Sequence, residues 1–421
     1  MRVSVLPSSV RGTVAAQPSK SHAQRVIAIA ALANGTSEIS GAGSSDDVHN
    51  ALNVIKALGA EVNTTSEVIN ITGGRSLSSH IWHCGESGLG IRMFCAIAGL
   101  FDTEIHLTAE GSLSSRDMNF MASPFTQLGV SFASSHGFPP LKIKGPYKSN
   151  SVVMDGSASS QFLTGLLIAL PNVHHDTLVE VRNLKSKPYI DLTLTTIQEF
   201  GVTVSHENHE KFKIAGGQKY KPASIRIGGD WSGMSFMFVA AALSGEVSVT
   251  GLPDAGSQAD GRILEALTAC GAFVSVQREE IIVRHHDLQP FEFDCTHCPD
   301  LFPPLAALAS HCNGISRIAG VHRLRSKESD RGEVLVSEFS KLGVGIRKAN
   351  DHLVIEGGHV QGGVADARGD HRIAMALATA ALKSKGPVTI SGAECVTKSY
   401  PGFFEDLASI GGDVQYLTDR S

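Results

Sequence analysis

Residues 325–333, which read RSKESDRGE, carry six charges in a chain that is only 18% charged. Lys327 and Arg331 stand four positions apart, and like charges at that spacing destabilise a helix. A solvent-exposed helix face is the usual explanation for a run of charges and stays an alternative, but it accounts for this segment poorly. Binding of a negatively charged ligand is the chemistry that the segment favours.

Cations recur at the predicted starts of other helices. A positive charge there opposes the helix dipole and costs roughly 0.3 kcal/mol or more, whereas glycines and free backbone N–H groups at a helix start favour a bound anion. Asp46, Asp47 and Asp260, at comparable positions, are interpreted as helix caps. The repeated cations therefore predict anionic ligands; they are Lys20, Arg116, Lys327, Arg331, Arg372 and Lys398.

These helix starts belong to a unit that occurs six times. A tag with a central glycine, as in ALGAEV and QLGVSF, recurs at intervals of 70, 72, 70, 72 and 68 residues. So regular a period indicates one repeated supersecondary unit. Each tag follows an amphipathic helical stretch and precedes a hairpin, so its glycine marks the end of a helix. The tag glycines are Gly59, Gly129, Gly201, Gly271, Gly343 and Gly411.

Each unit also contains a more apolar helix, such as RVIAIAALANG, and a short strand that links its two helices. The order strand, helix, strand, helix, hairpin predicts an α/β (α+β) fold whose sheets cover the apolar helices. Six units suit two lobes of three. Because the last unit lacks a full hairpin, we expect the N-terminal strand MRVSVLP to complete it. This assigns residues 1–17 and 230–421 to one lobe and 18–229 to the other.

Composition narrows the functional classes. A net charge of −5 favours neither nucleic acid nor an anionic membrane as a partner. The N-terminus has no features of a signal or transit peptide, and no apolar run reaches the roughly 18 residues of a membrane span. We expect a cytoplasmic monomer that acts on small molecules.

Seven cysteines are an odd number for a disulfide framework and suit reduced thiols. Cys295 and Cys298 have the spacing of zinc ligands, with His297 between them and His311 and Cys312 downstream. No second pair lies at zinc-finger spacing, so we expect ordinary thiols here, with zinc as the minor alternative.

Six motifs resemble those of the 5-enolpyruvylshikimate-3-phosphate synthase family, in the same order and over essentially the full length: PSKSHAQR, DGSASSQF, SKPYID, KESDR, GDHRIAM and TKSYPGFF. Six motifs in register are far more specific than one short pattern. The resemblance implies the two-lobed enolpyruvyl transferase fold, with six βαβαββ repeats, three per lobe, that close on substrate like a clamp.

The same resemblance implies an activity in the shikimate pathway, which leads to chorismate and the aromatic amino acids. The enolpyruvyl group of phosphoenolpyruvate would be transferred to the 5-hydroxyl of shikimate 3-phosphate, with release of phosphate and with no cofactor or metal. Each ligand carries about three negative charges, so several cations are needed to bring the two together in a partly dry cleft.

The matching motifs imply which residues bind each substrate. Shikimate 3-phosphate would contact Lys20, Ser21, Arg25, Ser159, Ser160, Gln161, Ser186, Tyr189, Asp300 and Lys327. Phosphoenolpyruvate would contact Lys20, Gly88, Arg116, Gln161, Arg331, Arg372 and Lys398.

Two carboxylates match the family's proton-transfer pair. Asp300 would take the proton of the 5-hydroxyl, and Glu328 would protonate the methylene carbon and deprotonate the methyl group during elimination. Lys20 would assist. Asp370 and His371 would orient neighbouring side chains and not transfer protons.

Four residues depart from the family pattern. Glu86 and Leu89 replace the usual asparagine and threonine in GESGLG, Asp117 stands where proline usually follows the arginine, and Arg323 replaces an asparagine found in some members. An extra carboxylate at Glu86 would weaken phosphoenolpyruvate binding unless Arg92 neutralises it. The departures bear on substrate affinity more than on the type of reaction.

Two other functions stay open. A UDP-N-acetylglucosamine enolpyruvyl transferase would lack KESDR and the paired serines, and would usually carry a cysteine where GSLSSRDM stands here. Glu86 favours a second alternative, a protein that has the same two-lobed fold and binds ligands but does not catalyse the reaction. This alternative is disfavoured by the presence of Asp300, Glu328 and Lys20, since binding alone needs no proton-transfer carboxylates.

Overall fold

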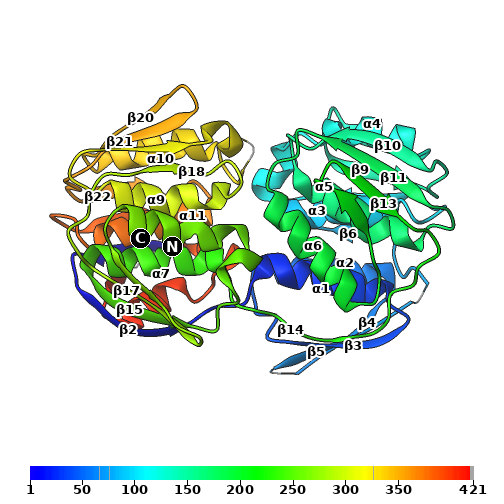
Figure 1. Cartoon of the computed structure of the whole chain (residues 1–421), viewed down its shortest axis with the longest axis horizontal. Helices are drawn as coiled ribbons and strands as arrows, with labels where there is room; N and C mark the ends of the chain where they lie inside the picture. The colour runs from blue at the N-terminus through cyan, green and yellow to red at the C-terminus, as the bar shows by residue number, and fades with distance from the viewer. Residues whose placement is uncertain (66, 75, 326, 418–421) are drawn as a thin grey trace. The chain divides into compact units, whose positions relative to one another are not determined.

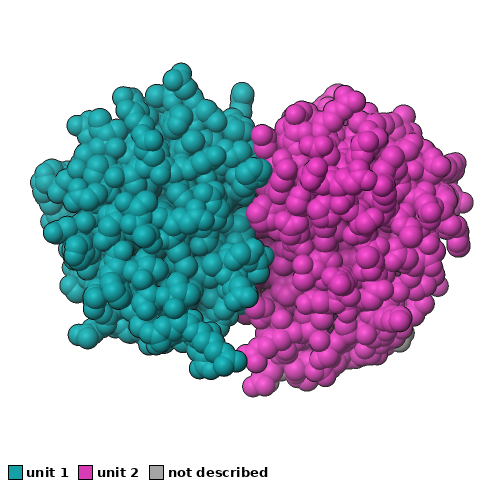
Figure 2. Space-filling model, viewed as in Figure 1, with its two compact units in different colours: residues 1–17, 229–421 teal, residues 18–228 magenta. Residues whose placement is uncertain are grey.

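The computed structural model describes residues 1–65, 67–74, 76–325 and 327–417. The chain forms two compact units, which Figure 2 shows in teal and magenta: unit 1 comprises residues 1–17 and 229–421, and unit 2 comprises residues 18–228. That the two units are separate folding domains stays a prediction. Within the described residues, no helix has the length and apolar character that crossing a membrane requires.

In the described residues, six four-stranded mixed sheets share one strand order: the first strand of a repeat, the second, the fourth and then the third. The first two strands are parallel, and the last two form an antiparallel hairpin or its equivalent. Two helices, one after the first strand and one after the second, complete each βαβαββ repeat (Figure 1).

Unit 2 contains three of these repeats. The first consists of β14 (Ser224–Arg226), α1 (Lys20–Leu32), β3 (Gly35–Ser40), α2 (Asp46–Leu58), β4 (Glu61–Thr64) and β5 (Val68–Gly73). The second consists of β6 (Ile81–His83), α3 (Gly88–Ala98), β7 (Ile105–Thr108), α4 (Ala122–Gln127), β8 (Ser131–Ser135) and β9 (Phe138–Lys144). The third consists of β10 (Ser151–Asp155), α5 (Ser160–Ala169), β11 (Thr177–Arg182), α6 (Lys187–Glu199), β12 (Ser205–Glu207) and β13 (Lys211–Ile214).

Unit 1 contains the other three. The first consists of β2 (Val10–Ala15), α7 (Trp231–Ser244), β15 (Gly245–Thr250), α8 (Ile263–Ala269), β16 (Phe273–Val276) and β17 (Glu280–Arg284). The second consists of β18 (Glu292–Asp294), α9 (Phe302–Ala309), β19 (Ile315–Ala319), α10 (Arg331–Lys341), β20 (Gly345–Ala349) and β21 (His352–Glu356). The third consists of β22 (Gly363–Asp366), α11 (His371–Ala381), β23 (Val388–Ser391), α12 (Phe403–Ser409), β24 (Asp413–Leu417) and β1 (Arg2–Leu6).

Short 3₁₀ helices join several of these elements: η1 (Gly111–Ser115), η2 (Asn119–Met121), η3 (Leu170–Asn172), η4 (Ala255–Ser257), η5 (Ala259–Arg262), η6 (Pro299–Leu301), η7 (Val321–Leu324) and η8 (Ala393–Lys398).

Strands from distant parts of the chain close three of the sheets. The N-terminal strand β1 pairs with both β23 and β24, so the expectation that it completes the last repeat is confirmed. In the same way, β2 pairs with β15. In unit 2, β14 lies near the end of the unit's sequence and pairs with β3 near its beginning.

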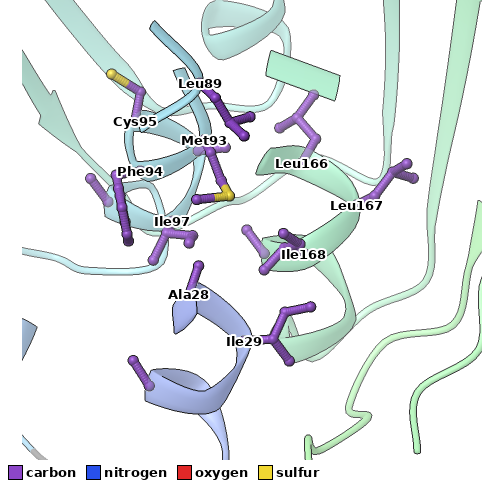
Figure 3. Close-up of a cluster of buried hydrophobic side chains, with 14 of the residues drawn as sticks. Ala28, Ile29, Leu89, Met93, Phe94, Cys95, Ile97, Leu166, Leu167 and Ile168 are labelled. Atoms are coloured by element: carbon purple, nitrogen blue, oxygen red, sulfur yellow. The ribbon is translucent and has the colours of Figure 1, made fainter. Parts of the chain in front are cut away.

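The two helices of a repeat differ in burial because they differ in the pattern of apolar residues along their sequences. In unit 2, α1, α3 and α5 are buried over most of their length, and their side chains pack against one another. Figure 3 shows Ala28 and Ile29 of α1, Met93 and Ile97 of α3, and Ile168 of α5 in this cluster. Helix α2, by contrast, is amphipathic and keeps an exposed face.

The six tag glycines end the second helix of each repeat. All six have positive φ angles, between 73° and 110°, a backbone conformation that glycine adopts without the steric cost of a Cβ atom. The prediction that they mark helix ends is confirmed. They are Gly59, Gly129, Gly201, Gly271, Gly343 and Gly411.

Candidate active site

In unit 1, Asp300 is surrounded by positive side chains. It lies in η6, at the start of α9. Its Oδ1 accepts hydrogen bonds from Lys327 Nζ at 3.1 Å and from Arg331 Nη1 at 2.9 Å, and Arg372 Nη2 lies 3.2 Å from Oδ2. Burial by itself would raise the pKa of Asp300. The three cations outweigh that effect and hold the pKa well below its ordinary value, so the carboxylate is ionised at neutral pH.

Arg331 joins three carboxylates. It is the first residue of α10 and its side chain is fully buried. Besides Asp300, its guanidinium donates to Glu328 Oε2 at 2.6 Å, and to Asp370 at 2.9 Å from Nε and 3.1 Å from Nη2. Burial would lower the pKa of Arg331, but the acids raise it above its ordinary value. One guanidinium thus holds the two predicted proton-transfer acids in place.

The starts of α10 and α11 and the end of η8 supply the rest of this cluster. Asp370 caps α11 by accepting from the Arg372 N–H at 3.0 Å, and it also accepts from Ser329 Oγ at 3.1 Å. Lys398 Nζ lies 3.9 Å from Glu328 Oε1. The residues from different repeats of unit 1 therefore share contacts: Asp300, Lys327, Glu328, Arg331, Asp370, Arg372 and Lys398.

In unit 2, Arg25 is buried among neutral oxygen atoms. Its Nε donates to Thr193 Oγ1 at 2.9 Å, and its terminal nitrogens donate to the Ser21 and Tyr189 carbonyls at 2.6 and 3.2 Å and to Thr164 Oγ1 at 3.4 Å. Burial lowers the pKa of Arg25 to about 10. These contacts join α1 to α5 and α6, so Ser21, Arg25 and Tyr189 lie together.

A second group in unit 2 gathers around the start of α3. Arg92 Nη1 donates to Gln161 Oε1 at 2.6 Å. A Cβ atom at Gly88 would lie 2.9 Å from Arg116 Nη1 and 3.3 Å from Arg92 Nη1. Any larger residue at position 88 would therefore displace a guanidinium, and glycine leaves room for both.

The remaining predicted residues of unit 2 lie at helix starts. Lys20, the first residue of α1, forms a 2.7 Å ion pair with Asp47 Oδ2. Ser159 caps α5 through a bond from the Gln161 N–H at 3.1 Å, with Ser160 buried beside it. Ser186 precedes α6 in the left-handed region, with φ of 56°.

The interpretation of Asp46, Asp47 and Asp260 as helix caps is wrong, because none of them occupies an N-cap position, although all three lie in the first turn of a helix. Ser45 occupies the N-cap position of α2, and the Asp47 carboxylate binds Lys20 instead. Asp260 accepts a hydrogen bond from Ser232 Oγ, because η5 and α7 pack together in the interior of unit 1. Both acids are buried, so each requires a partner across the interior.

Three of the residues that depart from the family pattern have clear contacts in unit 2. Ser112 Oγ donates to Glu86 Oε2 at 3.3 Å and accepts from Arg116 Nη2 at 3.2 Å, so a single hydroxyl links the extra acid to the predicted cation. Leu89 is buried in the apolar cluster. Asp117 accepts from the Asn119 N–H at 2.8 Å and stabilises a turn.

The histidine and cysteine downstream of the Cys295–Cys298 pair form hydrogen bonds to backbone carbonyls. All seven cysteines are free thiols. His311 Nε2 lies 2.8 Å from the Ala380 carbonyl, and Cys312 Sγ donates to the Leu308 carbonyl at 3.4 Å. Within the described ranges, neither Cys295 nor Cys298 belongs to a group of three or more close metal-binding side chains.

Sequence reasoning missed several of these contacts. The sequence predicts Arg92 as a partner for Glu86 but does not predict its bond to Gln161, or the bonds from Arg25 to Thr164 and Thr193. The position of Arg92 four residues after Gly88, on the same face of α3, was the one available signal.

The chain matches the family profile of EPSP synthase (3-phosphoshikimate 1-carboxyvinyltransferase) over residues 6–407. It is 36% identical to the 3-phosphoshikimate 1-carboxyvinyltransferase of Clostridium perfringens, over 98% of each chain. It is 38% identical to the enzyme of that name from Aeropyrum pernix, over 98% of this chain and 96% of the relative.

Solved structures agree with the sequence matches. EPSP synthase from Acinetobacter baumannii superimposes with a TM-score of 0.84 at 25% identity, over 99% of this chain and 100% of that one. The enolpyruvyl transferase NikO from Streptomyces tendae shares the fold, with a TM-score of 0.78 at 17% identity over 98% of both chains. The chain belongs to the EPSP synthase family.

Proposed function

We propose that this protein transfers the enolpyruvyl group of phosphoenolpyruvate to the 5-hydroxyl of shikimate 3-phosphate and releases phosphate. Membership of the EPSP synthase family supports the proposal. The observation that carries it is the pair of acids Asp300 and Glu328 on the single guanidinium of Arg331, at 2.9 and 2.6 Å. A protein that only bound these anionic ligands would gain nothing from two carboxylates beside the cations that bind them.

The proposed proton transfers follow from the chemistry of addition and elimination. Asp300 is ionised, which is the state that a general base for the 5-hydroxyl needs. Its three cations also weaken it as a base. If Arg331 and Arg372 also bind the anionic groups of phosphoenolpyruvate, they stabilise the Asp300 carboxylate less. The pKa of Asp300 then rises, and Asp300 becomes a stronger base when the substrate is bound.

Glu328 is proposed as the acid that protonates the methylene carbon and as the base that later removes a proton from the methyl group. Lys398 and Arg331 lie against it. Elimination then expels phosphate, and the cations stabilise the charge that develops on the leaving group. Lys20 is proposed to assist.

The binding residues are assigned as the motifs imply. Those proposed for shikimate 3-phosphate are Lys20, Ser21, Arg25, Ser159, Ser160, Gln161, Ser186, Tyr189, Asp300 and Lys327. Those proposed for phosphoenolpyruvate are Lys20, Gly88, Arg116, Gln161, Arg331, Arg372 and Lys398. The buried, positively charged Arg25 supports the first set, because its neutral partners leave its charge for an anion.

A steady-state assay of phosphate release with both substrates tests the proposal. We expect saturable phosphate release that requires both compounds, together with formation of the enolpyruvyl ether seen by mass spectrometry. Binding of shikimate 3-phosphate without phosphate release would identify a binding protein. Release only with UDP-N-acetylglucosamine as acceptor would identify the related transferase. Sedimentation of the same sample tests the predicted monomer.

A further inference from the structure

A cluster of metal-binding side chains lies in unit 2, at the turn between β12 and β13 and the adjacent face of α6. It consists of Asp191, His206 and His209, each of which offers a ligand atom within 4.8 Å of the other two. It is the one such group of three or more His, Cys, Asp or Glu side chains in the described part of the chain. None of its members belongs to the proposed substrate set.

The contacts within the cluster are close. His209 Nε2 lies 2.6 Å from Asp191 Oδ1, and the His209 N–H donates to His206 Nδ1 at 3.2 Å. The two imidazole rings stand 4.4 Å apart between centroids, and the His206 ring packs against Phe212 at 5.5 Å. The ligand set therefore comes from one helix and one hairpin and is already assembled.

The backbone of the turn is unusual at the histidine. The Glu210 N–H donates to the Glu207 carbonyl at 2.8 Å, and the two central residues, Asn208 and His209, have φ angles of 52° and 61°. This is a hairpin turn with both central residues left-handed, in which glycine is strongly favoured at the second position. A histidine at this position carries a steric cost that a glycine would avoid. The turn by itself therefore does not account for the presence of histidine.

We propose that Asp191, His206 and His209 form a binding site for a divalent transition metal of the zinc class. Two imidazoles and one carboxylate are a ligand set that Zn²⁺ accepts, with water completing a tetrahedral arrangement. The ion would take the place of the proton between His209 Nε2 and Asp191 Oδ1. The side chains of His209 and Asp191 are 19% and 53% exposed, so an ion reaches them from solvent.

The charge of the cluster suits a cation, because Asp191 contributes a carboxylate beside the two imidazoles. Lys213, which also projects from the hairpin, is paired with Glu207 at 2.6 Å. A bound ion would link the hairpin to α6, the helix that begins beside Ser186 and Tyr189.

Titration of the full-length, chelator-treated protein with ZnCl₂, followed by calorimetry, tests the proposal. We expect one Zn²⁺ per chain and a rise in the thermal unfolding temperature with added metal. The decisive variant is His209→Gly, which removes a ligand but places glycine where the turn favours it. We expect its affinity for Zn²⁺ to fall by more than the roughly 10–100-fold typical of losing an outer-shell partner, with no loss of metal-free stability.

Asp191→Asn and His206→Gln should each weaken Zn²⁺ binding, whereas His174→Gln, at an exposed histidine of the same unit, should not. Retention of wild-type affinity by His209→Gly would overturn the proposal. So would weak binding of several ions that His174→Gln reduces as much as the cluster variants do, because that pattern indicates scattered surface histidines.

Discussion

Arg331 of α10 in unit 1 and Arg25 of α1 in unit 2 are both buried arginines, but their partners differ in charge. Arg331 donates to three carboxylates, and these raise its pKa. Arg25 donates to hydroxyl and carbonyl oxygens, and burial lowers its pKa to about 10. In the described residues, no carboxylate forms an ion pair with Arg25.

This difference separates two uses of a buried cation. A guanidinium that neutralises acids holds them ionised and in position, which suits Asp300 and Glu328 as proton-transfer groups. A guanidinium among neutral oxygens retains its charge at the cost of desolvation, and a ligand anion offsets that cost. The two units have the same repeated architecture, so the difference arises from the side chains that surround each arginine.

The largest effect is expected at Arg331. Arg331→Met leaves Asp370 and its neighbours buried without a counter-charge, which should reduce the free energy of unfolding by about 3–5 kcal/mol. Urea unfolding measures this change. Arg317→Met is the matched control, because Arg317 and its partner Glu292, 3.8 Å away, are both exposed; such a surface pair contributes about 0–1 kcal/mol. Equal losses in both variants would remove the distinction drawn for Arg331.

Glu328→Gln tests the acid side of the same cluster. The amide keeps the shape of the side chain but cannot transfer a proton, so we expect kcat to fall about 100-fold or more, with binding of shikimate 3-phosphate nearly unchanged. Steady-state phosphate release and calorimetry measure the two quantities. Glu333→Gln is the control, at an exposed acid of α10 that pairs with Lys348 of β20. Wild-type turnover in Glu328→Gln would exclude this residue from the mechanism.

Arg25→Met should have the opposite profile to Arg331→Met. Loss of a charged hydrogen-bond donor should weaken shikimate 3-phosphate binding by about 1.5–3 kcal/mol. Stability should stay the same or rise, since a buried charge with neutral partners is removed. Binding calorimetry and urea unfolding report both. Arg182→Met, at an exposed arginine of unit 2, is the control. A loss of stability as large as that of Arg331→Met would contradict the comparison.

The smallest effect concerns Asp260, a buried acid of unit 1. Burial and the negative charge of Asp300 raise its pKa to about 6. The folded state then binds this proton more tightly than the unfolded state, so stability should fall as pH rises, by about 1 kcal/mol between about pH 5 and 7. Asp260→Asn should lose this component of the pH profile.

Urea unfolding at several pH values measures the Asp260 effect, and Asp413→Asn, at an exposed acid, serves as its control. An unchanged pH profile in Asp260→Asn would show that other groups of the cluster bind the proton.

Local patterns were enough to predict the repeat. The tag glycines and the helical spacing before them depend on neighbours within a few residues, so they predicted the helix ends and the βαβαββ order. The completion of the last sheet by β1 was also predicted, because the final repeat visibly lacked a strand. The return of β14 to β3 carried no such signal, since Ser224–Arg226 is only three residues long.

The partners of the charged side chains could not be predicted from local patterns. Motif resemblance predicted the set of site residues, and the roles of its members stay predictions. It did not predict that Asp47 binds Lys20, that Gln161 binds Arg92, or that Asp191 meets the two histidines of a hairpin. The Lys20–Asp47, Arg92–Gln161 and Asp191–His209 pairs are 27, 69 and 18 residues apart, too far for any local pattern.

The sequence by itself determined the repeated unit and the cations at its helix starts, because helix period, glycine conformation and the helix dipole act over a few residues. Only the tertiary structure decided which cation meets which acid. Burial makes an unpaired charge costly, and the packing of helices from different repeats selects the partner that removes the cost. Asp370 meets Arg331 from another repeat in this way, whereas Thr164 and Thr193 offer Arg25 only neutral oxygens.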